Sequence, residues 1–226
     1  MQRRNLILGG FAVAGLGGWA WTSQMGRDAG MPDVALPGAA NAQSTSGDFD
    51  TSSIPDMILG NPDAAVEVVE YASFTCPHCR SFHEGAYKQL KAEYIDTGKI
   101  KFVYREVYFD RPGLWASMLA RCGGEEKFFG IVDMLYQGQS TWARAGDPAA
   151  IVAELRKIGR LAGLTNESLE TCFQDATMAQ TLVAWWQENG DRDGINSTPS
   201  FLINGTRHSN MAYANMKALI DAELGA

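Results

Sequence analysis

The chain has 226 residues, of which 46% are hydrophobic and 20% charged, a composition typical of globular proteins and unlike that of collagen or a fully disordered chain. Its formal net charge of −7 argues against a nucleic-acid partner, because neutralising phosphates requires a basic stripe. We therefore expect one folded domain with a tail, and no bound cofactor.

The N-terminus has the order of an export signal, a charged start followed by an apolar run. Arg3 and Arg4 precede a glycine-rich apolar stretch from Leu6 to Trp21, and the arginine pair also resembles a twin-arginine signal. The stretch barely reaches the roughly 20 apolar residues that span a bilayer. Residues 1–25 are therefore predicted to be either a cleaved signal or a membrane anchor.

The next segment, residues 26–55, is rich in glycine, alanine, serine, proline and aspartate and shows no apolar periodicity. Such a segment cannot bury enough surface to fold, so we predict a flexible linker. Its run Ala40-Asn41-Ala42 resembles a cleavage site, although it lies roughly 20 residues beyond the apolar stretch. With an uncleaved anchor, the linker would tether the domain to the membrane.

Residues 56–226 are expected to form the folded domain. The β-branched, mostly apolar run 65–71 predicts a central strand. Residues 77–97 have helical spacing of their apolar positions, and 100–107 predict a second strand. Strand, helix and strand in this order predict a βαβ unit with parallel strands and a right-handed crossover.

Between residues 112 and 191 the apolar spacing is almost wholly helical, which predicts an inserted helical bundle. Strand character returns at 200–203. A two-residue Asn204-Gly205 turn of the favoured hairpin type leads to a short arm at 206–208. A closing helix is predicted over 212–224.

The motif Cys76-Pro77-His78-Cys79 lies where the first predicted strand meets the first helix. The unpaired N–H groups and the positive end of the helix dipole stabilise a thiolate there. Cys76 is therefore the expected nucleophile, and Cys79, one turn inside the helix, the buried resolving thiol. His78 is expected to lower the pKa of Cys76 further. A lower pKa makes the disulfide more oxidising, so the motif predicts a disulfide donor.

The chain has four cysteines, which permit three pairings. The two-residue spacer makes Cys76–Cys79 the easiest loop to close and leaves Cys122 to pair with Cys172. In an exported chain this second pair is interpreted as a structural disulfide that closes a loop of about 50 residues. A redox-active second pair and two free buried thiols are the alternatives.

Two weaker patterns lie near the motif. Cys76, Cys79 and His83 have the spacing of a partial zinc site, but no second cysteine pair completes it, so we predict instead that His83 lies on the exposed face of the first helix. Phe74 and Tyr108 are candidates for an aromatic substrate-binding patch beside the cysteines.

The sequence resembles the DsbA-like disulfide oxidoreductases of the bacterial envelope. The resemblance rests on the run from Phe74 to Cys79, on Glu70 six residues before Cys76, on the helical insertion, and on Thr198-Pro199 before the last hairpin. It extends from Asp56 to the C-terminus. It implies an α/β protein with a thioredoxin fold, an inserted all-helical subdomain and a periplasmic location.

The resemblance also implies roles for three further residues. In this family the proline before the hairpin is cis and faces the nucleophilic cysteine, a role that falls to Pro199. The backbone before it pairs with the substrate peptide, so Thr198 would line the substrate groove and tune redox poise. Glu70 resembles a buried acid that accepts the proton of Cys79, and burial would raise its pKa.

The function implied is donation of the Cys76–Cys79 disulfide to unfolded or reduced exported proteins, followed by reoxidation through a membrane quinone-linked partner. An isomerase or reductant on the same fold is the nearest alternative, although the segment from Asp28 to Pro55 is too polar for the dimerisation domain that isomerases usually add. A non-enzymatic chaperone or metal carrier is a further alternative. Its activity would survive alkylation of Cys76.

Overall fold

The computed structural model describes residues 49–225, and the predicted signal or anchor and most of the predicted linker lie outside this range. Within the described range, no helix is long and apolar enough to cross a membrane. The 3-10 turn η2 (Thr51–Ser53) and the buried Ile54 already belong to the fold. The folded part therefore begins a few residues before the predicted boundary at residue 56.

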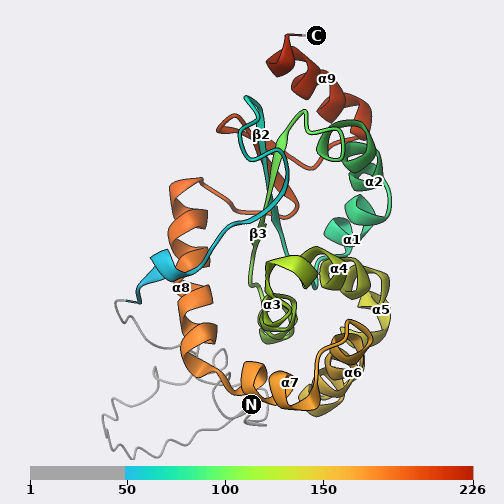
Figure 1. Ribbon diagram of the computed structural model, residues 1–226, viewed down its shortest axis with the longest axis vertical. Helices are drawn as coiled ribbons and strands as arrows, with labels where there is room; N and C mark the ends of the chain where they lie inside the picture. The colour runs from blue at the N-terminus through green and yellow to red at the C-terminus, as the bar shows by residue number, and fades with distance from the viewer. Residues whose placement is uncertain (1–48, 226) are drawn as a thin grey trace, which may run out of the picture. The chain divides into compact units, whose positions relative to one another are not determined.

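A mixed five-stranded sheet runs in the order β1-β3-β2-β4-β5 (Figure 1). The strands are β1 (Met57–Gly60), β2 (Glu67–Ala72), β3 (Lys101–Glu106), β4 (Ser200–Ile203) and β5 (Thr206–Ser209). β2 pairs with β3 in parallel and with β4 antiparallel, which confirms the predicted parallel strands. Asn204 and Gly205 both have positive φ, 44° and 80°, as a two-residue hairpin turn requires.

Strand β1 was not predicted. It has four residues and pairs antiparallel with β3 at the edge of the sheet. Met57 is buried and Ile58 is exposed, so the strand alternates as an edge strand should. A run this short carries too few positions for the alternation to be recognised in the sequence.

The single helix predicted over 77–97 consists of three pieces. These are α1 (Pro77–Glu84), α2 (Ala86–Leu90) and a π-helical turn, η3 (Lys91–Ile95). The break between the first two lies at Gly85, whose φ of −122° and ψ of −91° are not helical. Glycine tolerates this backbone because it has no Cβ.

The predicted helical insertion is confirmed, over residues 111–192. Its helices are α3 (Arg111–Cys122), α4 (Gly124–Gln137), α5 (Gln139–Trp142), α6 (Pro148–Leu161), α7 (Asn166–Gln174) and α8 (Ala176–Arg192). Asp110, Asp147 and Thr165 cap α3, α6 and α7 by accepting a hydrogen bond from a first-turn N–H. The closing helix α9 (Tyr213–Leu224) follows β5 as predicted.

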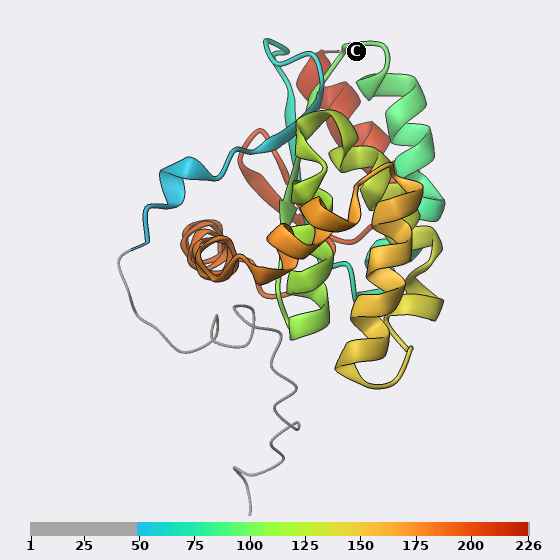
Figure 2. The ribbon, with the colours of Figure 1, turned by 60° about the horizontal axis from the view of Figure 1, so that its bottom comes forward.

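Helices cover both faces of the sheet. Val69 and Tyr71 of β2 face a small cluster that Trp186 of α8 covers, and α8 lies across the sheet from α1 and α2 in both views (Figures 1 and 2). Successive side chains of a strand point to opposite faces. Glu70 therefore points away from α8, into the layer that contains α1.

Candidate active site

Cys76 lies where the chain leaves β2 and enters α1. It is the N-cap residue of α1, with Pro77 in the first turn and no side chain capping the helix. Proline suits this position because its missing N–H would be unpaired there anyway. The Cys76 sulfur is half-buried and lies at the positive end of the α1 dipole, where a thiolate is stabilised.

Hydrogen bonds around Cys76 favour its ionised form. The pKa of the Cys76 thiol is lowered to about 5, because Cys79 hydrogen-bonds its sulfur and this outweighs the effect of partial burial. The Thr198 side chain and the backbone N–H groups of Cys79 and His78 lower the pKa further. His78 itself is exposed and contributes through its backbone. A role for its imidazole stays a prediction.

Cys79 has the opposite character. Its side chain is fully buried, and burial raises the pKa of its thiol far above the usual range. The hydrogen bond to Cys76 and the negative charge of Glu70 raise it further. The pair thus consists of one stabilised thiolate and one buried thiol. The attacking role of Cys76 and the resolving role of Cys79 stay predictions.

The Thr198-Pro199 peptide bond is cis and lies against the cysteines. The Cys76 thiol donates a hydrogen bond to the Thr198 carbonyl oxygen at 3.5 Å. The Thr198 hydroxyl is buried and has no other partner among the described residues, so it is free to donate to the Cys76 thiolate. The contact between a cis proline segment and Cys76 matches the expectation for Thr198 and Pro199. Their roles toward a substrate stay predictions.

Beneath the cysteines, Glu70 and His83 form a buried pair. Nε2 of His83 lies 3.2 Å from Oε1 and 3.0 Å from Oε2 of Glu70, and both side chains are almost wholly inaccessible. The prediction that His83 is exposed is therefore wrong. The reason is the helix period, because His83 follows the buried Cys79 by four residues and so shares its face. The proton-accepting role of Glu70 stays a prediction.

Aromatic side chains enclose this pair. The His83 ring stacks on Tyr136 with centroids 4.3 Å apart, and Tyr87 lies 4.4 Å away on a tilted plane. The Tyr136 hydroxyl lies 2.7 Å from that of Tyr104 and donates a hydrogen bond to the Ser73 carbonyl oxygen at 3.4 Å. The insertion therefore supplies part of the floor of the site.

No motif or periodicity in the sequence marks the residues that hold the loop before Cys76. The amide nitrogen of Gln139, at the start of α5, donates to the carbonyl oxygens of Phe74 at 2.8 Å and Cys76 at 2.9 Å. On the other side, Thr75 donates to the carboxylate of Asp110, which caps α3. Gln139 lies in the insertion and Asp110 immediately before it, both far from the loop in sequence, so only the tertiary structure reveals these contacts.

The prediction of an aromatic substrate-binding patch is wrong for Phe74, which is buried, while Tyr108 is only partly accessible. Phe74 is 1% exposed and packs on Tyr104 and Tyr136, so it supports the loop from below. Tyr108 is half-buried, and its hydroxyl has no partner in the described part of the chain. The exposed aromatic ring here is that of the next residue, Phe109, which is 58% exposed.

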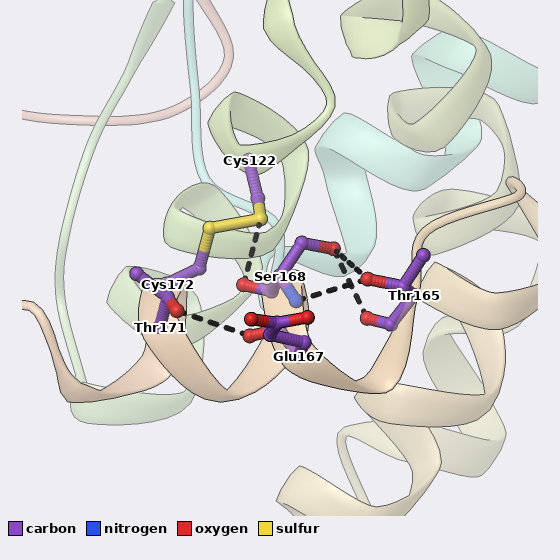
Figure 3. The surroundings of a disulfide bond; sticks show 6 residues. All are labelled: Cys122, Thr165, Glu167, Ser168, Thr171 and Cys172. Atoms are coloured by element: carbon purple, nitrogen blue, oxygen red, sulfur yellow. Dashed lines mark hydrogen bonds between the residues drawn. A yellow bond between two sulfur atoms is a disulfide. The ribbon is translucent and has the colours of Figure 1, made fainter.

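The second cysteine pair lies inside the insertion. Cys122, the last residue of α3, is bonded to Cys172 near the end of α7, and the two are separated by 50 positions in sequence (Figure 3). The bond fits the predicted pairing, and its structural role stays a prediction. Over residues 49–225, no group of three or more side chains is placed to hold a metal ion.

The topology and the placement of C-x-x-C at the first helix put the chain in the thioredoxin class of folds. Residues 52–222 match the sequence model of the family described as Thioredoxin, and the chain belongs to this family. In structure it is similar to Wolbachia pipientis alpha-DsbA1, with a TM-score of 0.69, 28% identity, and coverage of 76% of this chain and 92% of that one. BdbD from Bacillus subtilis, at 21% identity and a TM-score of 0.67 with coverage of 76% and 94%, shares the fold.

Curated relatives agree with this placement. A Rickettsia bellii protein provisionally named a protein-disulfide oxidoreductase is 36% identical over 167 residues, which are 74% of this chain and 63% of that protein. The Bacillus subtilis disulfide bond formation protein D is 26% identical, with coverage of 74% and 76%. The chain thus spans less than two thirds of the Rickettsia relative. The DsbA-like resemblance and the thioredoxin fold with a helical insertion are confirmed.

Proposed function

We propose that this protein is a thiol–disulfide oxidoreductase that donates its Cys76–Cys79 disulfide to exported proteins as they fold. The observation that carries the proposal is the Cys76 environment: a half-buried sulfur at the N-terminus of α1 whose pKa is lowered to about 5. A stabilised Cys76 thiolate favours the dithiol form. The disulfide form is then the stronger oxidant.

The reaction conserves thiols and disulfides. A substrate thiolate attacks the Cys76 sulfur, a mixed disulfide forms, and the Cys79 sulfur leaves and takes up a proton, as its raised pKa favours. A second substrate thiolate attacks the substrate sulfur of the mixed disulfide and releases Cys76 as a thiolate. The substrate gains a disulfide, and the enzyme is left as a dithiol that has taken up two electrons.

The remaining residues take supporting roles in this proposal. Pro199 and the Thr198 backbone hold the substrate peptide beside Cys76, and Glu70 exchanges the proton of Cys79. The substrates are unfolded or reduced exported proteins, and a membrane quinone-linked partner accepts the electrons. A periplasmic location, reached with residues 1–25 as a signal or anchor, goes with this role.

The test is the equilibrium of the full chain against a series of glutathione redox buffers. We expect a potential well above that of thioredoxin, toward the about −120 mV of strongly oxidising DsbA. A potential near the thioredoxin value of about −270 mV would overturn the oxidase and favour a reductant. Refolding of a reduced substrate, followed in parallel, separates an oxidase from an isomerase, because only the oxidase raises the number of disulfides.

A further inference from the structure

One property of the Glu70–His83 pair is not explained if His83 only pairs with the Glu70 carboxylate. Nε2 of His83 lies within hydrogen-bond distance of both oxygens of Glu70, yet its other ring nitrogen, Nδ1, is buried and has no hydrogen-bond partner among the described residues. An unpaired buried polar atom costs free energy. A glutamine amide in place of the His83 imidazole could pair with Glu70 equally well.

His83 also lines a cavity. It has a volume of about 100 Å³ and lies between α1, α2, η3 and α4. Its lining residues are His83, Glu84, Tyr87, Lys88, Lys91, Asp133, Tyr136 and Gln137. Several of these, including Glu84, Lys88 and Asp133, are exposed, so the cavity opens to solvent. A space of this size with polar walls holds water molecules.

The chemistry at Cys79 requires such a route. Its sulfur takes up one proton when the enzyme disulfide opens and must lose one when the disulfide closes again. Cys79 is 0% exposed, as is Glu70, so neither exchanges a proton directly with solvent. His83 contacts Glu70 and also lines the cavity, whose lining does not include Glu70.

We propose that His83 is a proton relay that connects the buried Cys79–Glu70 site to water in this cavity. The proposal rests on the proposed function, since Glu70 is the group that exchanges the Cys79 proton there. During uptake, a cavity water that reaches the buried Nδ1 passes it a proton drawn from bulk solvent, Nε2 gives its proton to Glu70, and Glu70 protonates the Cys79 sulfur. Release runs the same transfers in reverse. One proton crosses, and no electron moves in the relay itself.

Several charged or titratable groups surround the relay and shape its pH dependence. They come from every element packed against His83: Glu70 on β2, Cys79 and Glu84 on α1, Tyr87 and Lys88 on α2, Lys91 on η3, Tyr104 on β3, and Asp133 and Tyr136 on α4. Of these groups, Glu70 contacts the His83 ring directly and Asp133 lines the same cavity as His83.

The experiment follows closure of the Cys76–glutathione mixed disulfide into the Cys76–Cys79 disulfide, from about pH 5 to about pH 9, the range over which histidine and its neighbours titrate. In His83→Gln the amide still donates to Glu70 but cannot pass a proton on. We expect closure to slow roughly tenfold and the pH profile to change shape. Alkylation of Cys76, which requires no proton transfer at Cys79, should keep its rate, and His208→Gln on β5 serves as the matched control.

His83→Ala provides the second variant, and its folding is checked by thermal unfolding. Free imidazole should diffuse into the enlarged cavity and restore closure in His83→Ala, with no effect on His83→Gln. Wild-type closure by His83→Gln across the pH range overturns the proposal. Equal slowing of closure and of Cys76 alkylation does so as well, because that result indicates a merely structural role.

Glu70→Gln separates this proposal from the function on which it rests. If Glu70→Gln closes slowly and His83→Gln closes normally, the relay is wrong while Glu70 keeps its role. If Glu70→Gln itself closes at the wild-type rate, then the proton-exchanging role of Glu70 fails, and the relay fails with it.

Discussion

The two cysteine pairs use the same residue at opposite ends of helices. Cys76 is the N-cap of α1, where the helix dipole favours a thiolate, whereas Cys122 is the last residue of α3 and Cys172 lies in the last turn of α7. The negative end of the dipole disfavours a thiolate there. A sulfur that ionises poorly is a poor leaving group, so a disulfide between two helix C-terminal ends resists exchange.

The two pairs also differ in the loop that each one closes. Cys76 and Cys79 are 3 positions apart in sequence, whereas Cys122 and Cys172 are 50 positions apart. Cross-linking removes more conformational entropy from the unfolded chain when the loop is long. Helix position and loop length therefore assign exchange to the first pair and stability to the second, and the following predictions test that division.

The largest expected effect is on exchange. Cys76→Ala should reduce disulfide transfer to an unfolded, reduced substrate to the uncatalysed rate, because no other exposed thiolate replaces the nucleophile. The double variant Cys122→Ala/Cys172→Ala should transfer disulfides at close to the wild-type rate. Both rates come from one refolding assay. Activity that depends on Cys122 and Cys172 would show that the second pair takes part in exchange.

The next largest effect is on stability, where removal of the Cys122–Cys172 pair should matter more than removal of the Cys76–Cys79 pair. Cys122→Ala/Cys172→Ala should lower the free energy of unfolding by about 4 kcal/mol, the chain-entropy value for a loop of this length. Urea unfolding of the disulfide form measures it, with Cys76→Ala/Cys79→Ala as the matched control for the short loop. A loss below about 1 kcal/mol for the long loop would remove its structural role.

Sequence reasoning succeeded where chemistry and order along the chain act locally. The C-x-x-C at a strand–helix junction, the Asn204-Gly205 turn and the helical insertion are patterns of neighbouring residues, and the structure contains all three. The buried position of His83 could also have been predicted from its four-residue spacing to Cys79, but with no second cysteine pair to complete a zinc site this histidine was interpreted as exposed.

What the sequence could not provide are contacts between distant segments. Gln139 reaches the Cys76 loop from more than 60 positions away, and Arg121 forms a buried ion pair with Glu106 that attaches α3 to the sheet. No periodicity or motif marks such residues, because each depends on where two elements meet in space. Strand β1 was not predicted for a different reason, because it has only four residues.

The smallest expected effect concerns the thiolate itself. Alkylation of Cys76 by iodoacetamide follows the ionised fraction, and the pKa of Cys76 is lowered to about 5. The rate should therefore be constant above about pH 6 and fall tenfold for each unit below about pH 4. Cys122 and Cys172 should remain unmodified throughout, because their sulfurs are bonded to each other.

Thr198 allows this profile to be tested group by group. Thr198→Val removes the hydroxyl that stabilises the thiolate but keeps the side-chain shape and the carbonyl oxygen, so the alkylation midpoint should rise by roughly one unit, the effect of one hydrogen bond to a charged group. Thr198→Ser keeps the hydroxyl and should titrate like the wild type. If Thr198→Val and Thr198→Ser both keep the wild-type alkylation midpoint, then the low pKa of Cys76 depends on the α1 N-terminus and Cys79 alone. The difference between the two cysteine pairs would then be one of helix position.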